Sequence, residues 1–264
     1  MTDRILTVVD EDVSWRIMLL GITYSCGLAM LLDLIWGTSS KTVWPLSPLC
    51  GFALGSYTAT LIVTRYQHHG GYSFYETLWG CNMSLIFTTI SLWSQRPFLM
   101  MMSMCIVSGD QLCWYLDIFF YLFLGKCPIG VMRYLTYPEN QSWPKRIFAS
   151  HHLWFLPFCI YHVSLLEVHD RMPWTAFVAS CLVTSLLVVF CRYATPYEIH
   201  FPGQRAIYLN INGAYAFWRD VPIPFLHAFD DAPMYVYLAY LCTVGNFCVN
   251  GLPSLFIRYI ARHV

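Results

Sequence analysis

Long apolar runs separated by short polar connections make up most of the chain. Roughly 20 apolar residues are enough for a helix to cross a bilayer, and about seven stretches of the sequence have this character. The predicted crossings are 15–36, 47–64, 72–93, 98–124, 145–167, 174–191 and 234–257. The pattern predicts an all-α fold, a polytopic membrane helix bundle that occupies residues 1–264 as a single domain.

Two parts of this bundle are expected to be irregular. The fourth run carries Gly109, Asp110 and Asp117 among apolar residues. Because a carboxyl group that faces lipid is costly, we expect a fourth helix that is broken near Gly109 and lines a cavity. The stretch 206–229, before the last crossing, is too aromatic for a solvent-exposed loop. We expect it to be re-entrant or packed against the helices, since irregular backbone at membrane depth is tolerated only inside protein or beside water.

Composition supports a membrane protein. The chain is 57% hydrophobic and only 11% charged, whereas a soluble domain has roughly 25% charged residues with which to cover its surface. The net charge is zero and no basic stripe is present, so membrane lipids rather than nucleic acid are the expected partners. The first residues show no signal or transit pattern, and no cleaved targeting segment is expected. Lys and Arg are about twice as frequent in the connections on the N-terminal side, which places the N-terminus in the cytosol or its equivalent.

Three histidines, His151, His152 and His162, lie inside the fifth apolar run. Hydrocarbon offers an imidazole no hydrogen-bond partner, so these side chains are expected to face other helices or a wet cavity. Adjacent residues point in different directions around a helix, and at most one of the pair His151 and His152 easily faces a given pocket. Pro157 is expected to kink the helix just beyond them.

Cys81 is the cysteine for which the sequence most clearly suggests a chemical role. Most of the eleven cysteines lie in or beside apolar runs, where a thiol behaves as a small hydrophobe, and none forms a CxxC pair. A buried thiol reacts only if a partner takes its proton, and imidazole is the usual partner. If the third and fifth helices are neighbours, Cys81 and His152 lie at comparable depths and form a nucleophile and base for a lipid acyl group. The alternative is a packing cysteine near a structural histidine.

Further polar residues are candidates for lining such a site. Amides can donate to an oxyanion and carboxylates can orient an imidazole, although both can instead cap helices and satisfy backbone groups. The candidates for substrate or oxyanion lining are Asn82, Asp110, His151, Asn210 and Asn212.

No cofactor is predicted. A bis-histidine haem needs histidines on two facing helices, and the intramembrane histidines of this chain share one apolar run. No metal site is predicted either, because the spacing of His68, His69 and His200 supports no known ligand pattern.

The order of these features resembles a known superfamily. The matching stretches are GCNMSLIF with Cys81, SGDQLCWYLD, SHHLWFLPFCIY with His152, and LNINGAYAFWRDVPIPF with Asn210 and Asn212. They resemble the membrane acyltransferases and hydrolases that include transmembrane protein 164, the bacterial YwaF-like integral membrane proteins and, more distantly, the androgen-induced fatty-acid-ester hydrolases. The resemblance covers most of the chain from about residue 50 onward.

The resemblance implies a bundle of six or seven helices, a thioester on Cys81, His152 as the base and a glycerolipid acyl chain as substrate. It also favours the endoplasmic reticulum membrane, with a mitochondrial membrane as the alternative. In the acyltransferase branch a histidine follows the cysteine, where this chain has Asn82. The hydrolase branch uses an early threonine nucleophile, and Thr42, Thr58 and Thr60 are available, although none has a matching context.

Two functions of different classes follow from the sequence. The first is an intramembrane lipid acyltransferase, or acyl-ester hydrolase, that uses Cys81 and His152. The second is a catalytically silent structural subunit of a larger membrane complex, packed on partner helices and bound lipid. A transporter is a weaker third, because no inverted repeat is visible.

Overall fold

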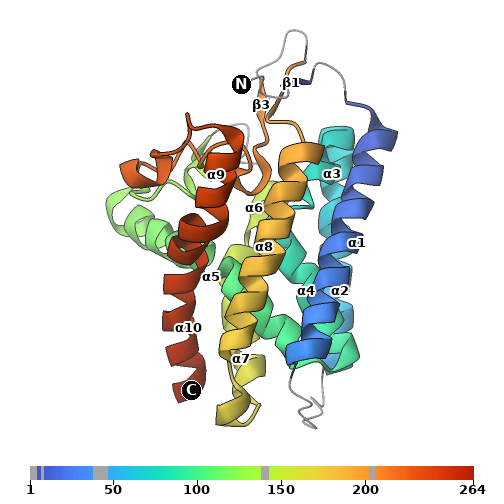
Figure 1. The fold of residues 1–264 in the computed structure, drawn as a ribbon, viewed down its shortest axis with the longest axis vertical. Helices are drawn as coiled ribbons and strands as arrows, with labels where there is room; N and C mark the ends of the chain where they lie inside the picture. Colours follow the sequence, from blue (N-terminus) through green and yellow to red (C-terminus); the bar gives the residue numbers. More distant parts are fainter. Residues whose placement is uncertain (1–4, 7–8, 38–46, 138–142, 202–205) are drawn as a thin grey trace.

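The computed structural model describes residues 5–6, 9–37, 47–137, 143–201 and 206–264. These residues are almost entirely helical and form a bundle (Figure 1). The longer helices are α1 (Glu11–Trp36), α2 (Ser47–His69), α4 (Gly80–Ser94), α5 (Pro97–Leu124), α7 (His151–Ser164), α8 (Trp174–Ala194) and α10 (Leu252–His263).

Short elements connect them. The short helices are α3 (Ser73–Glu76), α6 (Trp143–Ala149) and α9 (Met234–Tyr240), and 3-10 turns cover Gly70–Tyr72, Arg133–Thr136, Val168–Asp170, Ile211–Gly213 and Pro224–His227. Three two-residue strands, β1 (Ile5–Leu6), β2 (Glu198–Ile199) and β3 (Ile207–Tyr208), form a small sheet at one end of the bundle (Figure 1). β1 pairs parallel with β2, and β2 pairs antiparallel with β3.

Within the described ranges, four helical stretches are long and apolar enough to cross a membrane. They are Glu11–Trp36, Ser47–Glu76, Val168–Ala194 and Met234–His263. Large apolar side chains such as Leu34 and Phe52 are exposed on these helices, as expected of surfaces that face lipid. The chain is therefore an integral membrane helix bundle. The count of seven crossings and the cytosolic N-terminus stay predictions.

α5 is the central helix of the bundle, and it is continuous. Every residue from Pro97 to Gly109 is buried, and the helix contacts α4, α7, α8 and α10. The expected break near Gly109 is therefore wrong. The glycine instead permits a close approach to the last helical stretch, because a Cβ at this position would lie 1.7 Å from the carbonyl oxygen of Val249.

The structure also shows how α5 accommodates its buried carboxylate without a break. Asp117 is fully buried, and its side chain accepts hydrogen bonds from the backbone N–H groups of Ile129 at 2.8 Å, Gly130 at 3.2 Å and Met132 at 3.1 Å. The loop after α5 folds back over the helix and supplies these donors. A carboxylate with three donors is a satisfied group rather than an exposed charge.

Replacing Asp117 with asparagine is expected to lower the free energy of unfolding by about 1–3 kcal/mol, because the amide nitrogen would face an N–H group that then has no acceptor. Thermal unfolding in detergent measures the change. The exposed Asp231 gives a matched control, Asp231→Asn, for which no comparable shift is expected. Equal shifts in the two variants would contradict the structural role of Asp117.

Two of the predicted crossings are divided in the structure. The run 145–167 forms α6 and α7, which are separated at Ser150, before the histidines, and α7 remains helical through Pro157. The missing N–H of a proline leaves the carbonyl four residues earlier without its helical donor. That carbonyl, of Leu153, accepts the hydroxyl of Tyr115 at 3.2 Å. The bond satisfies the freed carbonyl oxygen without an interruption of the helix.

The run 72–93 is divided as well. It forms the end of a 3-10 turn, the short α3, a turn over 77–79 and then α4. Cys81 was expected in the middle of a membrane-spanning helix, but it is the second residue of α4. The thiol therefore lies at the beginning of a helix.

The segment between α8 and α9 packs against the bundle. Leu209, Ile211, Ala214 and Phe217 are buried, and the 3-10 turn Ile211–Gly213 contacts α8.

The last helical stretch is wider than an α-helix in its middle, because Leu241–Gly245 and Phe247–Gly251 are π-helical. The carbonyl oxygen of Asn250 in this stretch accepts the Ser108 hydroxyl of α5 at 3.1 Å. π-helical turns are frequent at functional sites, and this one borders the cavity described below.

Candidate functional site

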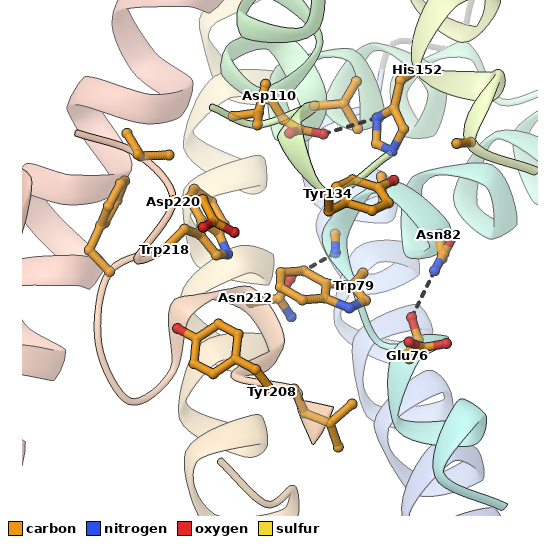
Figure 2. Close-up of a pocket in the computed structure, with 18 of the residues that line it drawn as sticks. Glu76, Trp79, Asn82, Asp110, Tyr134, His152, Tyr208, Asn212, Trp218 and Asp220 are labelled. Atoms are coloured by element: carbon orange, nitrogen blue, oxygen red, sulfur yellow. Dashed lines mark hydrogen bonds and ion pairs between the residues drawn. The ribbon is translucent and has the colours of Figure 1, made fainter. Parts of the chain in front are cut away.

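A cavity of about 1360 Å³ opens among the helices. Its wall comes from the end of α2, the start of α4, the middle of α5, the junction of α6 and α7, the segment 206–221 and the π-helical stretch. Figure 2 shows the side chains that project into it, among them Trp79, Asp110, Tyr134, His152, Tyr208 and Trp218. Elements far apart in the sequence thus contribute to one site.

Asn212 determines where α4 begins. Its side-chain nitrogen donates to the carbonyl oxygen of Leu78 at 2.8 Å, and its side-chain oxygen accepts the N–H of Gly80 at 2.8 Å. The side-chain nitrogen of Asn82 donates to the carbonyl oxygen of Glu76 at 2.7 Å. These side chains satisfy backbone groups that a continuous helix would have paired, so the chain can turn before Cys81.

The start of α4 beside Cys81 offers unpaired backbone donors. The first N–H groups of a helix have no acceptor within it, and in α4 these include the N–H groups of Cys81 and Asn82. The helix dipole also favours negative charge at this end. A thiolate or an oxyanion beside Cys81 is stabilised by both effects.

His152 is held in a defined orientation by two neighbours. Its Nδ1 lies 3.1 Å from Oδ2 of Asp110, off the line of an ideal hydrogen bond, and the Trp114 ring stacks on the imidazole with centroids 4.4 Å apart and planes within 5°. A carboxylate on Nδ1 leaves Nε2 as the nitrogen available for chemistry.

His151 lies behind His152 and is fully buried. Its Nδ1 is 2.5 Å from the carbonyl oxygen of Phe148, and its Nε2 has no hydrogen-bond partner among the described residues. The two imidazole rings have centroids 4.2 Å apart.

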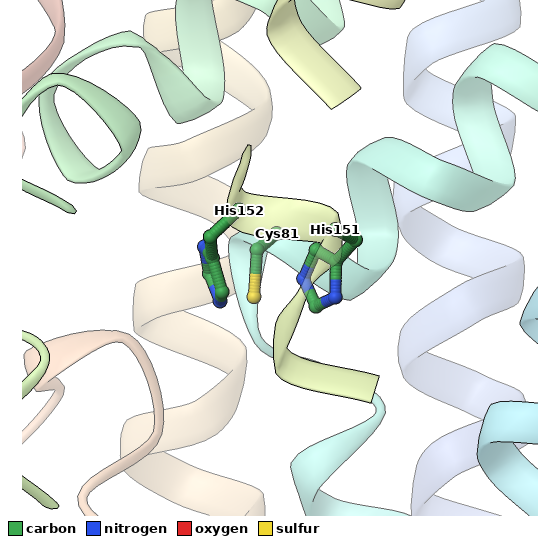
Figure 3. A group of neighbouring side chains, drawn as sticks. All are labelled: Cys81, His151 and His152. Atoms are coloured by element: carbon green, nitrogen blue, oxygen red, sulfur yellow. The ribbon is translucent and has the colours of Figure 1, made fainter. Parts of the chain in front are cut away.

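Both histidines lie close to Cys81. One ring nitrogen of His151, one of His152 and the Cys81 sulfur all lie within 4.8 Å of one another (Figure 3). His152 lines the cavity and His151 does not, which agrees with the expectation that only one of the pair faces a given pocket. Both rings nevertheless lie close to the sulfur. Cys81, His152 and Asp110 thereby form a series of thiol, imidazole and carboxylate.

The asparagines predicted to line the site have mainly structural contacts. Asn82 and Asn212 border the cavity, but their side-chain nitrogens are bonded to backbone carbonyls. Asn210 is not among the lining residues; its side-chain nitrogen donates to the Tyr208 hydroxyl at 2.6 Å and the Ala216 carbonyl at 2.8 Å, and its oxygen accepts the Tyr215 N–H at 2.9 Å. The structure does not bring Asn210 into the cavity. The backbone N–H groups of α4 are better placed to stabilise an oxyanion.

Several lining residues were not predicted from the sequence. Aromatic residues are so frequent in this chain that none stood out, and Trp79, Tyr134 and Tyr208 became visible only through the cavity. Burial raises the pKa of Tyr208, so its hydroxyl is neutral at physiological pH. Arg219 lies 4.1 Å above the Tyr208 ring, which adds a positive charge at the rim.

The two threonine alternatives that the structure describes, Thr58 and Thr60, are not placed for catalysis. The Thr58 and Thr60 hydroxyls each donate to the carbonyl four residues earlier in α2, at 2.8 Å, and neither residue lines the cavity. Thr42 lies outside the described residues.

Of the surface histidines, His68 and His69 border the cavity, while His200 lies 3.1 Å from the Glu198 carboxylate.

Comparison of the chain with protein-family models, curated proteins and solved structures found no match. The superfamily suggested by the sequence motifs therefore stays a prediction, and function is inferred from the geometry of the site.

Proposed function

We propose that this protein is an intramembrane lipid acyltransferase. Cys81 is the nucleophile, His152 the base and Asp110 the group that orients the imidazole. The observation that carries the proposal is that all three line one cavity, with the Cys81 sulfur within 4.8 Å of a His152 ring nitrogen. A nucleophile, a base within reach and a third group that orients the base are the elements of acyl-transfer sites on unrelated folds.

The reaction begins when the Cys81 thiol gives its proton to His152 and the sulfur attacks the carbonyl carbon of a lipid ester. The negative charge on the carbonyl oxygen is stabilised by the backbone N–H groups at the start of α4. The ester C–O bond then breaks, and the leaving alkoxide takes the proton from His152. A hydroxyl of a second lipid attacks the thioester, gives its proton to His152 and receives the acyl group as the thiol re-forms.

The dimensions of the site suit this reaction. The Cys81 sulfur lies no more than 4.8 Å from a His152 ring nitrogen, and catalytic contacts that are loose without substrate often tighten in its presence. Small-molecule pockets commonly measure about 300–1,000 Å³, and the larger cavity here matches an acyl chain with its glycerol backbone. Water in place of the acceptor lipid would make the protein an acyl-ester hydrolase. A seven-helix arrangement with a cytosolic N-terminus, in the endoplasmic reticulum membrane, belongs to the same proposal.

Trapping of the thioester tests the proposal. The purified protein is incubated with a glycerophospholipid that carries a tagged acyl chain and is then quenched in acid. A label that neutral hydroxylamine releases and that peptide mass spectrometry places on Cys81 is expected. Cys127, in the loop after α5, is the internal control and is expected to remain unlabelled. No label, or equal label on the two cysteines, would contradict the proposal.

The alternative of a silent structural subunit carries a different expectation. A fold retained only for assembly has no need to keep Cys81, His152 and Asp110 around one cavity, and their proximity supports the enzyme. The thioester experiment separates the two functions, because a structural subunit forms no acyl intermediate.

A further inference from the structure

His151 has no part in the acyl transfer proposed above, yet its ring is fully buried beside Cys81. Within the part of the chain that the structure describes, its Nε2 has no hydrogen-bond partner. A buried polar atom without a partner destabilises the folded state. A second function for this cluster of side chains would explain why the cost is tolerated.

We propose that Cys81, His151 and His152 form a binding site for a zinc-class divalent cation. Thiolate and imidazole are ligands that Zn²⁺ prefers, whereas Mg²⁺ and Ca²⁺ prefer oxygen. A tetrahedral zinc ion separates its nitrogen and sulfur ligands by roughly 3.3–3.6 Å. The three ligand atoms lie within 4.8 Å of one another, so side-chain movements of about 1 Å close the site around the ion.

The contacts around the two histidines are those of metal ligands. Nδ1 of His151 faces the Phe148 carbonyl at 2.5 Å, and Nδ1 of His152 faces the Asp110 carboxylate at 3.1 Å. Metal-binding histidines commonly donate a hydrogen bond from one ring N–H to a carbonyl or carboxylate oxygen. This bond fixes the ring and directs the other nitrogen to the ion. Both Nε2 atoms therefore remain available for a cation.

Charge and access agree with this assignment. A Cys81 thiolate and the Asp110 carboxylate carry two negative charges, which a divalent cation balances. Cys81 and His152 border the cavity, so a fourth ligand position would open towards it. Three protein ligands and one open position are the arrangement of zinc sites that keep a place for a water molecule or another small ligand, unlike closed structural sites.

The cation site does not depend on the proposed acyl transfer, but one consequence rests on that function. A ring nitrogen of His152 that binds zinc cannot accept the thiol proton, and coordination lowers the nucleophilicity of the sulfur, so the cation and the acyl group exclude each other. Zinc would then hold the enzyme in an inactive state until it is removed.

Cobalt titration of the chelator-treated protein in detergent tests the site. Co²⁺ bound by a thiolate gives a charge-transfer absorption, and the zinc content after exchange is measured by mass spectrometry. We expect one equivalent of metal in the wild type and loss of the absorption in Cys81→Ser and His151→Ala. Asp110→Asn is expected to weaken binding by about 10- to 100-fold. Cys159, a buried thiol of α7 outside the cluster, provides the control: Cys159→Ala should bind as the wild type does.

Zinc binding that persists unchanged in Cys81→Ser, or a wild type without the cobalt absorption, would overturn the inference and assign any bound metal to surface histidines such as His68 and His69. A second measurement avoids variants that fail to fold: zinc should protect Cys81 of the wild type from alkylation while Cys127 reacts as before.

Thioester trapping in the presence of chelator separates the two proposals. Thioester without metal binding refutes only the cation site, and metal binding without thioester refutes only the acyl transfer.

Discussion

Replacing His152 with alanine is expected to slow thioester formation on Cys81 by about 10²- to 10⁴-fold, the usual contribution of a positioned base. The thiol would stay at the start of α4, but the remaining imidazole, His151, does not line the cavity and has a carbonyl rather than a carboxylate beside its Nδ1. Single-turnover labelling with a tagged lipid, quenched at successive times, measures the rate directly. Asp110→Asn is expected to give a smaller loss, because the base remains and only its orienting carboxylate is removed.

His162 provides the matched control for this variant. It is a buried histidine of the same helix, α7, and its Nδ1 lies 2.9 Å from the Phe158 carbonyl. Removal of either imidazole opens a comparable space in the bundle, but only His152 borders the cavity. His162→Ala should therefore label at nearly the wild-type rate. Equal rates in His152→Ala and the wild type would remove the imidazole from the mechanism.

The class of fold and the key pair of residues were accessible from the sequence for physical reasons. A chain with so few charges cannot cover a water-facing surface, which leaves a membrane bundle as the solution. Imidazoles in apolar runs must find partners inside the protein, and this requirement drew attention to His151, His152 and His162. The structure places His152 beside Cys81 and the shared cavity.

The details of the helices were not accessible, because distant side chains decide them. The break before α4 depends on Asn212, which bonds to Leu78 and Gly80 from the other end of the chain. The continuity of α5 depends on a loop that folds back onto Asp117. A local sequence pattern does not show whether a distant residue will supply such a hydrogen bond. The sequence therefore predicted a continuous helix where the chain turns before α4, and a break in α5 where the helix is continuous.

The same dependence hid part of the site. Cys81 was expected in the middle of a helix, where every backbone N–H is already bonded. Its actual place, second in α4, turns the neighbouring N–H groups into donors for an oxyanion. The reactivity that we propose for this cysteine therefore depends on where α4 begins, and Asn212 determines that position.

Removing the Asn212 side chain is expected to cost both stability and reactivity. Asn212→Gly leaves the Gly80 N–H and the Leu78 carbonyl without partners, at about 1–3 kcal/mol each, so the free energy of unfolding should fall by about 2–6 kcal/mol. Glycine is the suitable replacement because Asn212 has a φ of 55°, which glycine adopts without strain. With the turn released, Cys81 loses its fixed place at the start of α4, and the thioester should form far more slowly.

Asn210→Gly separates these two effects. Asn210 also has a positive φ, 36°, and its side chain makes as many backbone contacts in the same segment, but none of them reaches the turn before Cys81. Both variants are expected to unfold at lower temperature, and labelling is compared well below both midpoints. Only Asn212→Gly should then show a slow reaction at Cys81. A similar loss in Asn210→Gly would mean that general loosening of the segment, rather than the position of the helix end, controls the nucleophile.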